Sequence, residues 1–179
     1  MTDKSVLTPI QQRFILHWGE MGARWGINRT VAQIHALLHV SGAPLSADAI
    51  AAALGVARSN VSTSLRELQE WGIVRAVHVL GDRRIHFASL TDVWELFRTI
   101  VDQRKRREID PTLAMLRQAI DELDRGKSED GHTRERLHAL LEFFETMTAL
   151  YDDLHRLPIA ALRSVARTRG KVRKLLAVK

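Results

Sequence analysis

One stretch of the sequence gathers side chains that could bind a polyanion and distinguish one base pair from another. It begins at position 58, where the 100-degree step of an α-helix puts short polar residues and arginines opposite an apolar stripe. These side chains are Arg58, Ser59, Asn60, Ser62, Thr63 and Arg66. Hydroxyl, amide and guanidinium groups form hydrogen bonds with base edges and phosphates. The segment therefore predicts a helix that reads nucleic acid with its N-terminal half.

The opposite face of this helix has the pattern needed to bury it. Val61, Leu65 and Leu68 recur at spacings of four and three, which predicts one apolar face. Acidic residues begin only at Glu67, so the N-terminal half can approach a polyanion without repulsion. The pattern favours insertion of the helix by its N-terminal end.

Two further arginines, Arg83 and Arg84, follow in a predicted hairpin. We expect a strand over 73–80, a turn at 81–82 and a returning strand over 85–90. The tip would present both arginines to the backbone or the minor groove of DNA. A solvated charged turn is the alternative. Asp82 is expected to preserve the shape of the loop by pairing with a tip arginine or with the turn amides.

The elements around these residues form a recognisable order over 45–91. Ser46 is expected to cap a short helix, Gly55 and Val56 to make a turn, and the helix from Arg58 to lead into the hairpin. Helix, turn, helix and hairpin in this order predict a winged helix-turn-helix. The expected fold class is mainly α, with a small β-hairpin wing and with N- and C-terminal dimerisation helices.

The segment before position 45 is predicted to hold two helices that act as a scaffold. The first carries an apolar stripe that would face the core or a second copy, or would form an aromatic wall for a ligand; its members are Ile10, Phe14, Trp18, Met21 and Trp25. In the second helix, His35 and His39 are four residues apart, as two metal ligands can be. No third ligand lies at a suitable spacing, so ordinary histidines and no metal are expected.

The segment after position 91 is predicted to be a helical dimerisation region over 92–162, followed by a basic tail over 163–179. Thr91 is expected to cap the first of its helices, Asp110 and Pro111 to restart the helix, and 126–131 to form a loop before a long helix over 133–155. These helices carry more apolar surface than a compact winged helix can bury, which favours a dimer. The basic run at 103–107 is either a solvated face or a contact to flanking DNA, and the tail either binds phosphates or is disordered.

Composition narrows the classes of function. The net charge of +6 in 179 residues favours a polyanionic partner. The absence of cysteine excludes disulfides and thiolate metal sites. No apolar run approaches the roughly 20 residues of a membrane span, and no secretory signal begins the chain, so a cytoplasmic protein is expected. Neither a phosphate loop nor a catalytic motif is present, so neither an enzyme nor a cofactor is expected.

Residues 45–91 resemble the winged helix domain of MarR-type transcriptional regulators. The pattern Asp82-x-Arg84 followed by Leu90-Thr91 is similar to the wing signature of that family, and HWGEMGARWGINRTVAQIHALLHVSG and LRELQEWGIV resemble its GbsR-type branch. The resemblance covers about Thr8 to Asp121. Members often have Ser where this chain has Ala57, so the cap of the DNA-reading helix is expected to be lost or to pass to Ser59. Such a loss typically costs about 0.5–2 kcal/mol.

The resemblance implies a homodimer with an effector pocket between its DNA-binding and dimer regions, and for the GbsR-type branch a choline-like quaternary ammonium effector. An aromatic box for such a cation could comprise Trp18, Trp25, Trp94 and Phe97, with core packing as the alternative. The leading hypothesis is a dimeric, sequence-specific regulator that represses or activates from an operator on double-stranded DNA. The alternative is a winged-helix module for protein interaction, which would show acidic or apolar residues on the outer face of the second helix.

Overall fold

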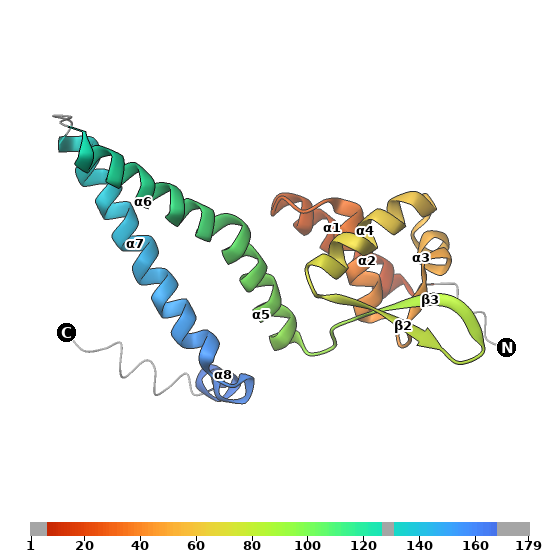
Figure 1. Ribbon diagram of the computed structural model, residues 1–179. Coiled ribbons are helices and arrows are strands. Elements are labelled where there is room, and N and C mark those ends of the chain that lie inside the picture. The colour runs from red at the N-terminus through yellow and green to blue at the C-terminus, as the bar shows by residue number, and fades with distance from the viewer. Residues whose placement is uncertain (1–6, 127–130, 168–179) are drawn as a thin grey trace. The chain divides into compact units, whose positions relative to one another are not determined.

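The computed structural model describes residues 7–126 and 131–167, and the chain divides into two compact units, Met1–Ile100 and Val101–Lys179 (Figure 1). The N-terminal unit contains α1 (Pro9–Arg24), α2 (Arg29–Val40), β1 (Leu45–Ser46), α3 (Ala47–Leu54), α4 (Arg58–Glu70), β2 (Val74–Val79) and β3 (Asp82–Ser89). The chain continues through α5 (Val93–Arg104), a π-helical turn η1 (Lys105–Ile109), α6 (Asp110–Arg125), α7 (Gly131–Arg156) and α8 (Ile159–Arg167). The prediction of a mainly helical winged helix is confirmed.

The helices α2, α3 and α4 enclose the core of the N-terminal unit. The predicted inner face of α4 is buried, and Ile34 of α2 and Ile50 of α3 pack into the same cluster. Ser46 caps α3 as expected, because its Oγ accepts a hydrogen bond from the amide of Ala49 at 3.2 Å. Gly55 then ends α3 with a positive φ of 64°, which glycine adopts without the steric cost that a Cβ brings. A helix-turn-helix results.

The aromatic stripe predicted for α1 faces the core only in part: Phe14 and Trp18 pack against the core, while the fully buried positions of the helix lie beside the stripe. The buried residues are Ile15, Gly19 and Gly22, whereas Ile10 is 70% exposed and Trp25 is 59% exposed. The reason is the close approach of α1 to α2. A Cβ at position 22 would lie 2.5 Å from the Cβ of Ala32, and one at position 19 would lie 2.6 Å from Cγ of Gln33. Two glycines therefore determine which face of α1 is buried.

His35 and His39 lie on α2 without a metal site. The His35 side chain is buried, and its Nε2 lies 3.2 Å from Oγ of Ser89 on β3. Among the described residues, no group of three or more His, Asp or Glu side chains could hold a metal ion. His35 therefore acts as a buried link between α2 and the sheet.

The sheet has three strands in the order β1-β3-β2, all antiparallel, where the sequence predicted a two-stranded hairpin. The missed strand, β1, is only two residues long, and its Ser46 also caps the helix that follows. The tight turn lies at Leu80 and Gly81, one residue earlier than predicted, because Gly81 supplies the positive φ of 84°. The wing begins and ends close to its predicted bounds.

Two helix starts after the wing also differ from prediction. Asp92, and not Thr91, caps α5, since its Oδ1 accepts the amides of Trp94 and Glu95 at 2.8 and 3.2 Å. The chain does not restart at Asp110. It stays helical through η1, and the Asp110 carboxylate pairs with Nζ of Lys105 at 2.9 Å instead of capping α6. Because Ile109 and Asp110 both have helical dihedrals and the Asp110 amide donates to the carbonyl of Lys105, the helix is continuous here and leaves no free N-terminus to cap.

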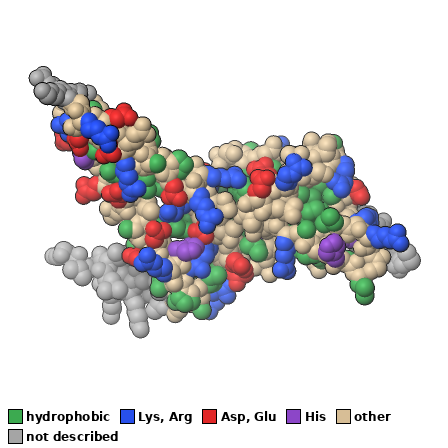
Figure 2. Space-filling view, in the orientation of Figure 1, with side chains coloured by type: hydrophobic (Ala, Val, Ile, Leu, Met, Phe, Trp, Pro, Cys, Tyr) green, Lys and Arg blue, Asp and Glu red, His purple; other side chains and the backbone are tan. Residues whose placement is uncertain are grey.

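The C-terminal unit is a hairpin of long helices. Leu113, Leu116 and Ile120 of α6 are buried, and Arg117 pairs with Glu145 of α7 at 2.8 Å. Acidic and basic side chains are mixed on the visible face of this unit (Figure 2). Much of the predicted loop at 126–131 and of the predicted tail at 163–179 lies outside the described residues. No helix in the described part of the chain is long and apolar enough to cross a membrane.

Candidate nucleic-acid interface

The outer face of α4 carries the side chains that the sequence singled out. Val61, Leu65 and Leu68 are at most 2% exposed, so the register of the helix is determined by the core. The opposite positions are exposed: Arg58, Ser59, Asn60, Thr63 and Arg66. Ser62 is half-buried beside them. The structure therefore gathers on one surface the donors and acceptors that were predicted to contact DNA.

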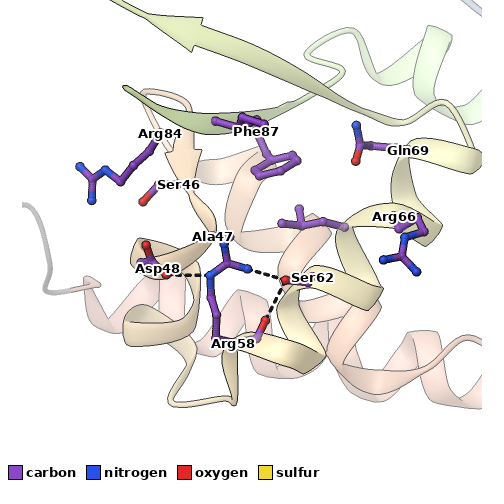
Figure 3. Close-up of a pocket in the computed structure, with 11 residues that line it drawn as sticks. Ser46, Ala47, Asp48, Arg58, Ser62, Arg66, Gln69, Arg84 and Phe87 are labelled. Atoms are coloured by element: carbon purple, nitrogen blue, oxygen red, sulfur yellow. Dashed lines mark hydrogen bonds and ion pairs between the residues drawn. The ribbon is translucent and has the colours of Figure 1, made fainter. Parts of the chain in front are cut away.

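The first turn of α4 is held by an ion pair where a side-chain cap is missing. Ala57 occupies the N-cap and makes no side-chain hydrogen bond, so the predicted cap is lost and does not pass to Ser59. Nε of Arg58 instead donates to Oδ1 of Asp48 on α3 at 2.7 Å, and Nη1 of Arg58 donates to Oγ of Ser62 (Figure 3). This contact orients Arg58 and links the two helices of the helix-turn-helix.

The wing arginines lie in an irregular part of β3. The register changes from His78 opposite Ile85 to Val79 opposite Asp82, so Arg83 and Arg84 fall between the paired positions. A bulge of this kind bends a strand and redirects its side chains. Both arginines are exposed. The bulge thus presents two guanidinium groups on the wing.

Asp82 holds this bulge closed. Its Oδ1 accepts the amide of Arg84 at 2.9 Å, and its Oδ2 accepts Nη2 of Arg84 at 2.6 Å, as the prediction of a loop-shaping aspartate required. The hydrogen bonds from Arg84 hold the pKa of the Asp82 carboxyl well below its usual value, and they raise the pKa of the Arg84 guanidinium. Asp82 is therefore an anion throughout the physiological range, and it is neutralised by its neighbour.

Two other arginines are unengaged. Within the described chain, neither Arg66 nor Arg83 takes part in an ion pair or a side-chain hydrogen bond, in contrast to Arg58 and Arg84. An unpaired guanidinium binds a phosphate or a base edge without first giving up a carboxylate. Arg66 and Arg83 are therefore the cations of this surface that are most accessible to an anionic ligand.

A groove of about 360 Å³ separates α4 from the wing (Figure 3). Its lining includes Asp48, Arg58, Arg66, Gln69, Arg84 and Phe87. Three of these residues, Asp48, Gln69 and Phe87, were not predicted from the sequence to belong to this site. Gln69 could have been found, since positions 62, 66 and 69 follow helical spacing along one edge of α4. The groove brings the helix arginines and a wing arginine to one surface.

The four residues proposed for an aromatic box differ in their burial. Trp18 is half-buried and stacks at a tilt on Phe14, with ring centroids 5.4 Å apart, as a core residue would. Trp25, Trp94 and Phe97 are exposed. Within the described chain, neither Trp94 nor Phe97 forms a ring–ring contact. Of these four residues, only Trp18 therefore packs as a core residue.

The fold is a winged helix-turn-helix whose second helix, α4, exposes Arg58 and Arg66 on its outer face. Residues 25–85 match the sequence model of the MarR family, a range that includes α2, α3, α4 and part of the wing. No protein among curated sequences matches the chain.

This chain is also similar in structure to several solved proteins. A protein described as a transcriptional regulator has 20% identity and a TM-score of 0.66, over 82% of this chain and 96% of that one. A mutant of MepR from S. aureus bound to an oligodeoxyribonucleotide has 16% identity and a TM-score of 0.38, over 77% and 92%. A transcriptional regulator of Thermotoga maritima has 16% identity and a TM-score of 0.38, over 82% and 92%. The first of these shows that the fold is shared over most of both chains.

Proposed function

We propose that this chain is a sequence-specific, DNA-binding transcriptional regulator of the MarR type. The observation that carries the proposal is the outer surface of the N-terminal half of α4, which holds no acidic residue and lies beside a wing whose bulge presents two arginines. The N-terminal half of α4 enters the major groove, where Asn60, Thr63 and Arg66 contact base edges. Arg58, Arg83 and Arg84 contact phosphates and supply affinity that depends on salt. The match of residues 25–85 to the MarR family supports this assignment.

Two other classes of function, a protein-interaction module and an enzyme, are less well supported. A protein-interaction module would show acidic or apolar side chains there, whereas the exposed residues of its N-terminal half are Arg58, Ser59, Asn60 and Thr63. The MarR family match supports the expectation that the chain is not an enzyme. A DNA-binding regulator of this kind acts in the cytoplasm, where its operator lies.

The regulator acts as a homodimer in this proposal. Helix α7 has no buried residue, although five apolar side chains follow one another along it at spacings of three and four. These side chains, which we call the α7 stripe, are Leu140, Phe143, Met147, Leu150 and Leu154, and each is 45–57% exposed. A second copy of the chain would cover the stripe, and a two-fold dimer would place two reading helices on two half-sites.

An effector of the quaternary ammonium class, as the GbsR-type branch implies, completes the proposal. The exposed rings of Trp25, Trp94 and Phe97 can attract such a cation through their π faces. Choline is then expected to change the intrinsic tryptophan fluorescence and the operator affinity of the chain. If choline changes neither quantity up to millimolar concentration, the quaternary ammonium effector is excluded while the DNA-binding function stands.

Two single substitutions test DNA recognition. Arg84→Ala removes a guanidinium from the wing and should weaken binding to every duplex, with the slope of log affinity against log salt reduced by about one. Arg66→Ala should lower the affinity for the operator about tenfold, the effect of one lost base contact. The ratio of the affinity for the operator to the affinity for a random duplex should therefore also fall. Fluorescence anisotropy with a labelled operator, selected from genomic fragments by the full chain, measures both effects.

The matched control is Arg125→Ala, since Arg125 is an exposed arginine of α6 outside the winged helix. It should leave both affinities unchanged. Equal affinities for the parent chain, Arg66→Ala and Arg84→Ala would contradict the proposed reading surface.

A further inference from the structure

One acidic side chain, that of Asp48, lies on the surface that is proposed to face DNA. Among the described residues that line the groove between α4 and the wing, Asp48 is the only acidic one, whereas three are arginines. A carboxylate at this place repels the phosphates of a bound duplex. Its position in the first turn of α3 suits the helix dipole, but that effect does not require a contact with α4. The contact that Asp48 makes therefore calls for its own explanation.

This contact restrains one guanidinium group, that of Arg58. Oδ1 of Asp48 accepts a hydrogen bond from Nε of Arg58 at 2.7 Å, and Oγ of Ser62 accepts one from Nη1 (Figure 3). The Ser62 hydroxyl in turn donates to the carbonyl of Arg58 at 3.1 Å, so it is itself held in place. Within the described chain, Nη2 of Arg58 makes no hydrogen bond. The guanidinium is thus fixed at two nitrogens, and the third is available to an anion.

The charge of Asp48 acts on two arginines of this surface. It neutralises Arg58 through the ion pair. It also reaches Arg84 of the wing, because the hydrogen bond to Asp82 is the main cause that raises the pKa of the Arg84 guanidinium, and the charge of Asp48 adds to it. Since attraction to DNA grows with the positive charge of a surface, Asp48 lowers the affinity for a duplex of any sequence. Only a complex that uses the fixed Arg58 offsets this reduction.

We propose that Asp48 is a specificity-determining residue, which holds Arg58 in the orientation that meets one phosphate of the operator and weakens its attraction to other phosphates. The inference rests on the proposed DNA-binding function. Phosphate contacts determine the register of a protein on its duplex. A fixed Arg58 makes its contact only when the base contacts of α4 are in register, whereas a mobile Arg58 would follow phosphates in any register. A restrained side chain also loses little conformational freedom on binding the operator.

Asp48→Ala tests the inference, because its expected effects on two duplexes have opposite signs. The affinity for a random duplex should rise about threefold, and its slope of log affinity against log salt should steepen by about one, since a mobile Arg58 adds a phosphate contact. The affinity for the operator should fall about threefold, because the oriented contact is lost. The ratio of the two affinities should therefore fall about tenfold. Fluorescence anisotropy measures both, with the operator defined as the duplex that the full chain selects from a random pool.

The matched control is Glu20→Ala. Glu20 is also an exposed acidic residue close to an arginine, at 3.8 Å from Arg29, but it lies on α1. This variant changes the net charge equally and should leave the ratio of affinities unchanged. A second comparison uses the Arg58→Ala background, in which Asp48→Ala should no longer lower the ratio. Circular dichroism checks that each variant is folded.

Four results would overturn the inference while a selective parent chain leaves the proposed function intact. Unchanged affinities in Asp48→Ala would exclude any role in binding. A parallel fall of both affinities would indicate a role in folding alone, and a parallel rise would indicate charge alone. An equal loss of the ratio with and without Arg58 would show that Asp48 does not act through that arginine. Failure of the parent chain to select any duplex would instead reject the proposed function.

Discussion

We expect the free energy of unfolding to fall by about 3 kcal/mol between pH 6.5 and pH 4 because of one side chain, His35. Its imidazole is 4% exposed, and burial lowers its pKa from 6.5 to about 4, with a further contribution from the charge of His39. One pKa unit corresponds to about 1.4 kcal/mol of difference between the two protonation states. The shift of the His35 pKa therefore corresponds to roughly 3 kcal/mol.

The sign of the change in stability with pH follows from which state, folded or unfolded, binds the proton. Above pH 6.5 the ring is neutral in both the folded and the unfolded chain, so His35 adds no pH dependence there. Below pH 6.5 the unfolded chain binds a proton that the folded chain rejects, and stability declines until the pH reaches about 4.

Urea unfolding at several pH values, monitored by circular dichroism, measures the effect. His35→Gln keeps a polar side chain that can contact Ser89 but cannot titrate, so its stability should lack the decline that His35 causes between pH 6.5 and pH 4. Asp82 does not affect the comparison of the parent chain with His35→Gln, because it is present in both. Its carboxyl has an ordinary pKa of 3.8, and this pKa is lowered further in the folded chain. Parallel stability curves for the parent chain and His35→Gln would show that His35 is not the titrating group.

The winged helix could be predicted because its signals are local. The stripe Val61, Leu65 and Leu68 determines the face of α4, and the opposite side chains follow from the helical period. Ser46 as a cap and Asp82 as the residue that shapes the wing were also correct, since both act over two or three residues. Short-range patterns of this kind need no knowledge of the tertiary structure.

The predictions that were wrong share one physical cause. In each case, contacts between distant parts of the chain selected one of several local structures that the sequence allowed. On α1, the close approach of Gly22 to Ala32 buries positions beside the predicted stripe, of which Phe14 and Trp18 pack against the core. Strand β1 exists only because β3 passes beside it, and a continuous helix through Ile109 and Asp110 took the place of a predicted helix start. Such pairings depend on the fold and leave no periodic pattern in the sequence.

The same distinction applies to the candidate site. The sequence identified its arginines by type and position, yet it gave no sign that Arg58 would pair with Asp48 ten residues earlier. It also gave no sign that a register change would place Arg83 and Arg84 in a bulge. As a result, residue types could be predicted, while the division into engaged and available guanidinium groups required the structure.

Replacing Phe143 and Leu150 together by aspartate should convert the proposed dimer to monomers and reduce operator affinity by a hundredfold or more. Both side chains belong to the α7 stripe and are more than half exposed in the single chain. Two carboxylates in an apolar interface would have to lose their hydration without gaining partners, which opposes association strongly. A monomer engages only one half-site at a time, so it loses the advantage of linked binding.

Sedimentation equilibrium reports the oligomeric state, and anisotropy with operator DNA reports affinity. The matched control is Ala149→Asp, because Ala149 is also exposed on α7 but lies about 140 degrees around the helix from the centre of the stripe. This variant should remain dimeric and bind the operator as the parent chain does. If the double variant is a dimer with full affinity, the α7 stripe is not the dimer interface. Because the substituted side chains are exposed in the protomer, both variants should keep the helical signal of the parent chain, so loss of dimerisation can be separated from loss of the fold.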